Sequence, residues 1–397
     1  MSTDQAARVS RRQLIGSAAG GAAALGLGAT FLPDLLGGGA ARPKKVAVTT
    51  RTGYGPLGAP DANGIRLPEG FNARLVARSG KPIAGSSAAV HPNPDGAATF
   101  AAPGGGWIYV SNSEGTPGSV GAIRFGDDGE PAGFQEIARG TAYNCSGGAT
   151  PWNTWLSCEE VPFGRVWECD PLGRRAAAPR PALGLFKHEA VAADPVGLRL
   201  YMTEDLPDGR FYRFTPARWG RLDSGLLEVA TVKGPRVEWT RVPDPTGGTL
   251  ETRLQVKAST NFLRAEGIWR AGRTVYIGTT EDSKVHALDL DRQRIDVVYD
   301  GFARPNPPLL ALDQMTGSPA GELFIAEDNG KPEQGISTLD PPRGVDRFLT
   351  VSGPIHAGSE LSGVAFTPAG DRLYFASQRA YGSGAIYEVR GPFRSRL

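Results

Sequence analysis

The chain has 397 residues, of which 40% are hydrophobic, and a formal net charge of +2. This near-neutral balance argues against a nucleic-acid or anionic membrane-surface partner. Its 54 glycines and 32 prolines would suggest disorder in a polar chain. With this apolar content they favour a single all-β domain of short strands and tight turns.

The N-terminal residues predict an export signal. Arg11 and Arg12 precede an apolar stretch that runs to about Leu36. Paired arginines before a weakly hydrophobic run are typical of a Tat signal, which we place at 1–41. A Sec signal or a membrane anchor is the alternative, but Pro33 and several glycines argue against a stable spanning helix. We therefore expect passage through the Tat machinery to the periplasm, cell surface or medium, without stable membrane insertion.

One short pattern, an apolar strand that ends in a carboxylate or its amide, occurs six times along the rest of the chain. The last residues of these strands are Glu114, Glu159, Glu204, Glu281, Glu327 and Gln378. Most successive copies lie about 45 residues apart. A repeat of this length built from strands and turns predicts a β-propeller, here with six blades.

The same repeat predicts the domain organisation. An extended lead-in is expected at 42–70 and one propeller domain at 71–397. The longest interval between copies implies an insertion around 215–259. We expect the strands Asn72–Arg78 and Ala385–Arg390 to pair and to close the ring, because closure leaves no free sheet edge.

A polar residue opens the first strand of each predicted blade. In three blades this residue lies six positions before a turn proline. It is Glu189 in one of them, Asp313 in another and the thiol Cys145 in the third, so a thiol replaces a carboxylate in that blade. In a blade, the start of the first strand and the end of the second lie at the same face. The predicted inner ring therefore consists of Asp95, Cys145, Glu189, Glu266, Asp313 and Glu360.

Carboxylates that converge on one channel mouth repel one another unless a cation neutralises them. The ring therefore predicts a multinuclear metal site. Carboxylates alone suit calcium, whereas a thiolate among them favours a transition metal such as iron. The alternatives are exposed loop carboxylates and a small buried thiol at Cys145. Cys158 is a rival thiolate or a disulfide partner of Cys145, and Cys169 is a spare thiol.

Several neighbouring residues are candidates for supporting roles. His188 is a possible ligand or a donor to a ligand, or else a structural histidine. Glu159 and Glu204 would orient ligands or pair with backbone at strand ends. Arg264, two residues before Glu266, could bind an anionic oxygen through two hydrogen bonds, or form an ion pair with a ring carboxylate.

Several of these segments resemble the PhoX family of alkaline phosphatases. The similarity runs from about residue 55 to residue 378. Its most specific part is NCSGGATPWNTWLSCEE. The segments that carry it are Asn144–Glu160, His188–Pro195, Tyr201–Phe214, Arg264–Trp269 and Glu360–Phe375.

The resemblance implies a propeller with two ferric ions and two or three calcium ions near its axis, which hydrolyses phosphate monoesters. Oxide and a cysteine thiolate would bridge the irons, and an oxo or hydroxo group would attack phosphorus. By motif, Cys145 would be the bridging thiolate and Arg264 would hold a phosphate oxygen. The carboxylates implied as iron and calcium ligands are Glu189, Glu266, Asp313 and Glu360.

Three functions are compatible with these patterns. The first is an exported metal-dependent phosphatase that acts on small phosphate esters. The second is a calcium-dependent lactonase or phosphotriesterase, which also uses propeller carboxylates but needs no thiolate. The third is a degenerate propeller that binds a ligand or partner without turnover.

Overall fold

The computed structural model describes residues 53–341 and 343–395, so the predicted signal at 1–41 lies outside the described residues. The regular structure of this part consists of strands and four short 3-10 turns, η2 to η5. No helix in it has the length and apolar character needed to cross a membrane. The turns are Pro181–Leu183, Thr252–Leu254, Pro354–His356 and Ala380–Gly382.

Hydrogen bonding groups the strands into five antiparallel sheets, three of them four-stranded. The first has the order β3 to β6, with strands Pro94–Ala101, Trp107–Ser113, Gly118–Phe125 and Pro131–Thr141. The second has the order β7 to β10, with Asn144–Ala149, Trp155–Glu159, Val166–Cys169 and Ala178–Pro179. The third has the order β24, β25, β26, β2, with Leu361–Phe366, Arg372–Ser377, Ala385–Arg390 and Asn72–Arg78.

The two other sheets are larger. The five-stranded sheet has the order β20, β21, β22, β23, β1, with Leu312–Gly317, Leu323–Glu327, Gln334–Asp340, Gly344–Val351 and Ile65–Arg66. The nine-stranded sheet begins with β11 to β15, which are His188–Asp194, Arg199–Glu204, Phe211–Arg218, Arg221–Lys233 and Arg236–Arg241. It continues through β19, β18, β17 and β16, which are Arg294–Asp300, Lys284–Asp289, Thr274–Thr279 and Ala265–Ala271.

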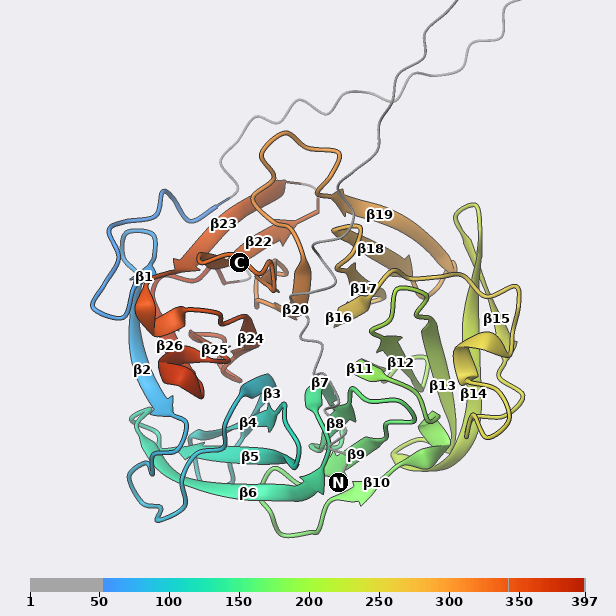
Figure 1. Cartoon of the computed structure of the whole chain (residues 1–397), viewed down its shortest axis with the longest axis horizontal. Coiled ribbons are helices and arrows are strands. Elements are labelled where there is room, and N and C mark those ends of the chain that lie inside the picture. Colours follow the sequence, from blue (N-terminus) through green and yellow to red (C-terminus); the bar gives the residue numbers. More distant parts are fainter. Residues whose placement is uncertain (1–52, 342, 396–397) are drawn as a thin grey trace, which may run out of the picture. The chain divides into compact units, whose positions relative to one another are not determined.

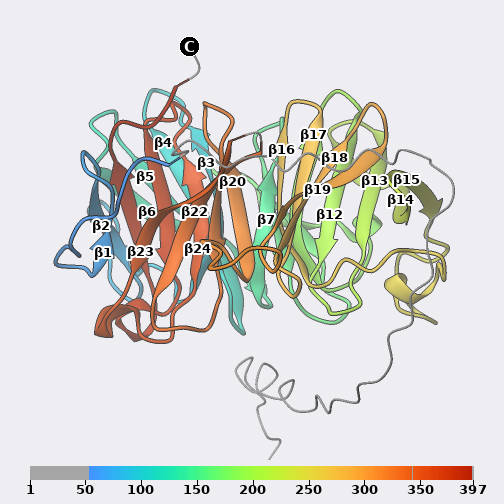
Figure 2. The same cartoon turned by 90° about the horizontal axis from the view of Figure 1, so that it is seen from above.

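The sheets stand around a common axis, as in a propeller (Figure 1). Six first strands face this axis, and each packs against the next in the order β3, β7, β11, β16, β20, β24 and back to β3. The strands run from one face of the ring to the other (Figure 2). The prediction of an all-β, propeller-like fold is confirmed.

The count of separate sheets differs from the expected six blades. Two runs of four consecutive strands, β11 to β14 and β16 to β19, belong to one sheet because β15 connects them. The connection is a single residue pair, Arg236 with Arg294. The strands β14 and β15 and the turn η3 lie in or reach into the segment 215–259, where we expected an insertion.

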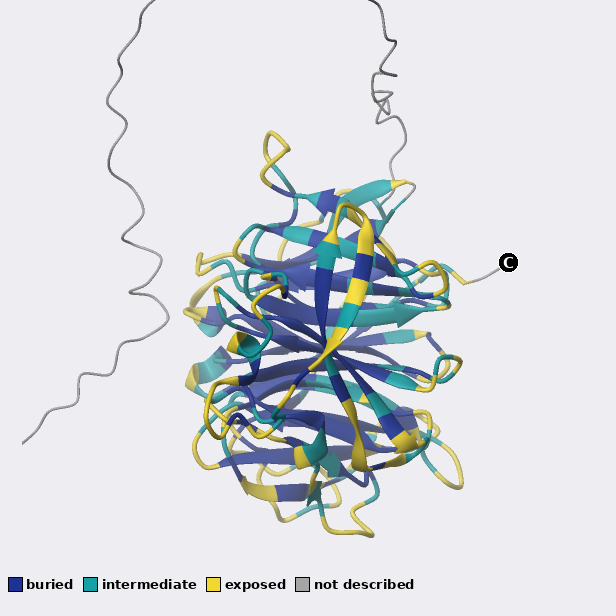
Figure 3. Cartoon of the chain, turned by 90° about the vertical axis from the view of Figure 1, so that its right-hand side faces the viewer, coloured by how far each residue is buried: buried dark blue, intermediate teal, exposed yellow. Residues whose placement is uncertain are grey.

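The second strand is buried on both faces over most of its length in five of the six hairpins, whereas one face of β17 is only partly buried. Strand β4, for example, is buried along its whole length and reads WIYVSNS, rich in aromatic and β-branched residues. Apolar side chains of adjacent sheets meet between the blades, as Tyr109 and Tyr374 do with ring centroids 5.1 Å apart. Figure 3 shows buried strands throughout the ring and exposed residues mainly in the loops and on outer strands.

The ring closes by pairing of strands from its two ends, as predicted. Strand β2 pairs with β26 from Asn72 with Arg390 to Arg78 with Ala385. The buried carboxylate of Glu388 in β26 accepts a hydrogen bond of 3.0 Å from Arg74 in β2. Strands β2 and β26, from near the two ends of the described chain, therefore share one sheet.

A cluster of aromatic rings secures the same region. Tyr54 and Phe71 come from the beginning of the described chain, and Phe393 comes from its end. All three contact Phe348 of β23, with ring centroids 5.2–5.8 Å apart and mostly edge to face. Such pairs add to the stabilisation that burial of the rings provides.

Replacing Phe348 should therefore weaken the whole fold. Phe348 is 1% exposed, and truncation of a buried phenylalanine to alanine typically costs about 3–5 kcal/mol. We expect Phe348→Ala to lower the free energy of unfolding by this amount in urea denaturation. Phe302→Ala is the control, because Phe302 is 66% exposed and its loss should change stability by less than about 0.5 kcal/mol. Equal losses in both variants would contradict a stabilising role for the aromatic cluster.

Candidate metal centre

A β-bulge recurs near the start of the first strand in all six hairpins. In five of them the residue pairing shifts between Pro94 and Ala97, Asn144 and Gly147, His188 and Val191, Ala265 and Ile268, and Leu312 and Met315. A bulge bends the strand and redirects a side chain. The first residues within these five bulges are Asp95, Cys145, Glu189, Glu266 and Asp313. Five members of the predicted ring thus occupy one structural position.

The structure brings these side chains together with two further carboxylates. The side chains form three groups of three residues, and within each group the potential ligand atoms lie within 4.8 Å of one another. The groups share Cys145 and Glu189, so they form one continuous set, which we call the axial cluster. Its members are Asp95, Glu114, Cys145, Glu160, Glu189, Glu266 and Asp313.

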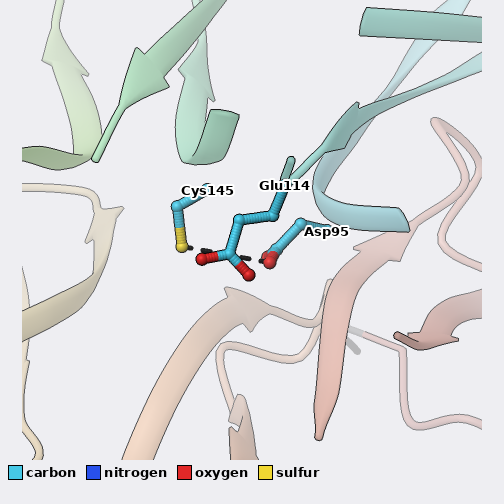
Figure 4. Close-up of side chains that lie close together, drawn as sticks. All are labelled: Asp95, Glu114 and Cys145. Atoms are coloured by element: carbon cyan, nitrogen blue, oxygen red, sulfur yellow. Dashed lines mark hydrogen bonds between the residues drawn. The ribbon is translucent and has the colours of Figure 1, made fainter. Parts of the chain in front are cut away.

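Cys145 lies at the junction of two of these groups. Its Sγ is 3.2 Å from Oε1 of Glu189 and 3.9 Å from Oδ2 of Asp95. Figure 4 shows Asp95, Glu114 and Cys145 pointing toward one another from two neighbouring blades. The thiol is therefore in contact with carboxylates on both sides.

Burial and like charge oppose ionisation in the axial cluster. Burial, with added repulsion from neighbouring carboxylates, raises the pKa of Cys145, Glu189 and Asp313 well above the usual values. Oε2 of Glu189 and Oδ1 of Asp313 are buried and have no hydrogen-bond partner among the described residues. Buried acceptors without partners cost about 1–3 kcal/mol each. Their number and charge fit the binding of cations, which would remove both penalties.

Two glutamine amides hold the carboxylates at one end of the axial cluster. Nε2 of Gln378 donates to Oδ2 of Asp95 and, at 2.7 Å, to Oε2 of Glu114. Gln314 donates to the other oxygen of Asp95, while its own Oε1 accepts from the backbone amide of Gly363 at 2.7 Å. Outer hydrogen bonds of this kind orient metal ligands.

Two cationic side chains border the axial cluster on another side. Arg264 donates to Asp205 at 2.9 Å and to Oε1 of Glu266 at 2.7 Å. Lys187 donates to Glu160 at 2.8 Å and to Asp205 at 3.1 Å. Burial raises the pKa of Asp205, but Lys187 and Arg264 outweigh it and hold that pKa below its usual range. The ion pair that was one alternative for Arg264 is therefore present.

Glu360, the sixth member of the predicted ring, lies slightly apart. It precedes β24, and the bulge in that hairpin falls later, between Ser362 and Ala365. Its Oε2 lies 3.4 Å from Nη1 of Arg379. Its charge nevertheless contributes to the raised pKa of Asp313, after burial and the nearer carboxylates.

The three proposed supporting residues have other hydrogen-bond partners. Glu159 accepts from two backbone amides of adjoining loops. Glu204 accepts from a backbone amide and from the hydroxyl of Tyr212. Nε2 of His188 pairs with the carbonyl oxygen of Gly184 at 3.0 Å. In the described part of the chain, none of them bonds to the axial cluster, and an orienting role stays a prediction.

Sequence reasoning missed Glu114 and Glu160 as members of the cluster, and Asp205 as the partner of Arg264. Each directly follows the second strand of its hairpin. Glu159 and Glu204 belong to the strands themselves, where they pair with Asn144 and His188. Since side chains alternate along a strand, a shift of one residue moves the side chain to the other face. The adjacent acids in Glu159-Glu160 and Glu204-Asp205 were the available signal.

All three cysteines are free and buried, so the bridge between Cys145 and Cys158 that we left open is absent. Cys158 packs in an apolar core group with Leu156 and Val166. It belongs to none of the three groups of potential ligands in the described residues. Cys145 is the thiol that lies among carboxylates.

Comparison with known proteins agrees with this geometry. The sequence profile of the family described as alkaline phosphatase PhoX matches residues 123–162 and 161–307. No curated protein sequence matches the chain. The structure of Pseudomonas fluorescens PhoX in complex with vanadate is similar, with a TM-score of 0.66, 17% identity, and coverage of 85% of this chain and 97% of that chain.

Two other solved structures share the fold at lower similarity. A putative gluconolactonase has a TM-score of 0.50 and 13% identity, with 86% of this chain and 100% of that chain covered. A Bacteroides thetaiotaomicron protein of unknown function has a TM-score of 0.51 and 12% identity, with 81% and 76% covered. The profile match over residues 123–307 and the shared propeller together make this chain similar to the PhoX alkaline phosphatases in sequence over its middle part and in fold over most of its length.

Proposed function

We propose that this protein is an exported, metal-dependent phosphatase that hydrolyses phosphate monoesters at a multinuclear iron and calcium site in the axial cluster. The observation that carries the proposal is the contact of Cys145 with Glu189 among buried carboxylates. These two residues, together with Glu160 and Glu266, lie in the part of the chain that matches the family profile. A mixed set of thiol and carboxylate ligands suits iron and calcium side by side.

The donor set suggests how the metals would be distributed. Cys145, Glu189 and Glu266 would hold two ferric ions with adjoining calcium, and Asp313 and Glu360 would hold further calcium, two or three calcium ions in all. The bound cations would neutralise phosphoryl oxygens and the charge that develops in the transition state. Gln378 and Gln314 would keep Asp95 in place.

Arg264 is the proposed contact for a substrate phosphate oxygen. Its guanidinium group is held by Asp205 and Glu266, which would pre-organise it for an anion at low entropic cost. Its backbone adopts a φ of 51°, which is uncommon for a non-glycine residue and typical of strained functional sites. The related Pseudomonas fluorescens structure contains vanadate, described there as a transition state analogue, in agreement with phosphoryl transfer on this fold.

The proposal extends to architecture and location. If β11 to β14 and β16 to β19 are counted as separate blades, the propeller has six. We propose a Tat-type signal at 1–41, a lead-in at 42–70, and the propeller at 71–397 with an insertion around 215–259. The exported protein would then act in the periplasm, at the cell surface or outside the cell.

Metal content tests this function directly. Protein exported through its own signal should contain about two iron ions per chain together with calcium, measured by elemental analysis. Cys145→Ala should lose the iron, and its phosphate monoester hydrolysis should fall more than about 100-fold, beyond the 10–100-fold typical of losing an outer partner of a ligand.

The matched control for this experiment is Cys158→Ala, which removes a buried thiol that lies outside the axial cluster. It should retain iron and most activity. Calcium without iron would favour the lactonase or phosphotriesterase alternative, and absence of both metals would favour a non-catalytic propeller. Unchanged iron in Cys145→Ala would refute the thiolate assignment.

Arg264→Ala should raise KM for a phosphate monoester about 10–100-fold, because a charged hydrogen bond to the substrate is lost. The KM of Arg264→Lys should lie between those of the wild type and Arg264→Ala, since lysine keeps the positive charge but cannot donate two parallel hydrogen bonds. Metal content should stay unchanged in both variants. Arg270→Ala is the control, because Arg270 lies at the distant end of its strand and donates to the carbonyl of Ala193. An unchanged KM in Arg264→Ala would leave Arg264 with its ion pairs as its only role.

Glu189→Gln should stabilise the metal-free protein at high pH. Burial and neighbouring carboxylates raise the pKa of Glu189 in the folded state. The stability that this group contributes is full below its unfolded pKa of about 4.3 and is lost as pH rises through the folded value. In the presence of a chelator, the free energy of unfolding of the variant should therefore be higher than that of the wild type at pH 8. The difference should be about 1.4 kcal/mol for each unit below pH 8 by which folding raises the pKa of Glu189, and it should be smaller at pH 5.

Urea denaturation at the two pH values measures this difference. Glu69→Gln at an exposed position should change stability by less than about 0.5 kcal/mol at either pH. With iron and calcium restored, the order should reverse, because the variant lacks a ligand. A variant that is less stable than the wild type at pH 8 in chelator would contradict the electrostatic account.

A further inference from the structure

A second hollow lies at the same end of the blades as the axial cluster. It has a volume of about 210 Å³, and we call it the side pocket. Its walls come from the loop after β8, the segment before β11, the segment after β12 and the turn η3. Its lining residues include Phe163, Phe186, Lys187, Glu204 and Leu206.

The side pocket adjoins the axial cluster through Lys187. This side chain lines the pocket, and its Nζ donates to Oε1 of Glu160 in the cluster at 2.8 Å. Leu206, on another wall, directly follows Asp205, which holds Arg264. A molecule with its phosphate at the cluster would thus have the side pocket within reach of its organic group.

The walls of the side pocket combine apolar residues with polar and charged ones, and part of the apolar wall is rigid. Phe186 stacks on Tyr212 with ring centroids 4.2 Å apart, so its position is fixed from behind. Phe163 is 51% exposed and adopts a φ of 57°. Because this ring is both exposed and part of the pocket wall, it is available to contact the apolar part of a ligand.

Glu204, which lines the side pocket, has one carboxylate oxygen without a partner in the described part of the chain. Glu204 is 1% exposed, and its Oε2 accepts from the hydroxyl of Tyr212 at 2.9 Å and from the amide of Arg210 at 3.0 Å. Its Oε1 is buried and has no hydrogen-bond partner among the described residues. A buried acceptor in this state indicates a missing donor.

The size of the side pocket limits what it can hold. Pockets that enclose drug-sized ligands measure about 300–1,000 Å³, and this one is smaller. It suits a single ring or a short apolar group with one donor.

We propose that the side pocket binds the organic group of the phosphate ester, and that it selects aromatic or compact apolar esters. Phe163 and Leu206 contact the apolar part, and Oε1 of Glu204 accepts a hydrogen bond from a donor on it. This inference rests on the proposed function, since it places the phosphate at the axial cluster. It adds a substrate class and the residues that choose it.

The test compares binding and hydrolysis in the metal-loaded protein. Phenylphosphonate and methylphosphonate, which are not hydrolysed, are titrated by calorimetry, and kcat/KM is measured for benzyl phosphate and methyl phosphate, whose leaving alcohols are of similar acidity. The wild type should favour the compound with the aromatic ring about three- to tenfold in both assays, the range expected for an aromatic contact. Phe163→Ala should lose this preference without changing the values for the methyl compounds.

Two further variants sharpen the result. Phe302→Ala removes another exposed ring, one that does not line the side pocket, and should keep the preference. In Glu204→Gln, Tyr212 and Arg210 would both donate to the amide oxygen, so its NH₂ would replace the acceptor at Oε1. The variant should therefore bind a phenylphosphonate with a ring amino group more weakly than the wild type does, and phenylphosphonate equally well.

The outcomes separate this inference from the proposed function. Hydrolysis without a preference that depends on Phe163 would overturn the side-pocket proposal and leave the phosphatase intact. A preference in phosphonate binding that depends on Phe163, with no ester hydrolysed, would support the side pocket and overturn the phosphatase. An equal effect of Phe302→Ala would also overturn the side-pocket proposal.

Discussion

Repulsion among carboxylates buried at one point of the propeller axis is the constraint on which the rest of this structure depends. Six carboxylates and a thiol converge in three overlapping groups, and the cationic partners Arg264 and Lys187 stand at one edge of them. Apolar packing does not offset such a concentration of like charge, so either protonation or bound cations must relieve it, and the function proposed above assigns this role to cations. The closed ring of strands supplies the rigidity that holds these carboxylates and the thiol together when no cation is bound.

The fold and much of the site could be predicted because both depend on the repeat. The period of the strands predicted the propeller. The position that opens each hairpin predicted Cys145, Glu189, Glu266 and Asp313 as members of the candidate site. Their common bulge explains why one sequence position per blade was sufficient. Residues of one blade could be superposed on those of the next without knowledge of how the blades pack.

The remainder of the site could not be predicted, for two physical reasons. In the tandem acids Glu159-Glu160 and Glu204-Asp205, the direction of each side chain depends on where the strand ends, and sequence patterns place strand ends only to within a few residues. The contacts of Gln378 with Asp95 and Glu114 cross between blades that are far apart in sequence. Likewise, a single residue pair at β15 merges two blades into one sheet, and no periodic signal marks it.

The pairing of β2 with β26 also has a consequence for the order of folding. The two partners are separated by more than 300 residues, so the last sheet cannot form until almost the whole chain has left the ribosome. Glu360 precedes the first strand of the sheet that contains this joint, and Asp95 belongs to the sheet next to it. The full set of predicted ligands, from Asp95 to Glu360, is therefore held in place only once β26 has been made and has paired with β2, so a cofactor that needs all of them can bind only after that step.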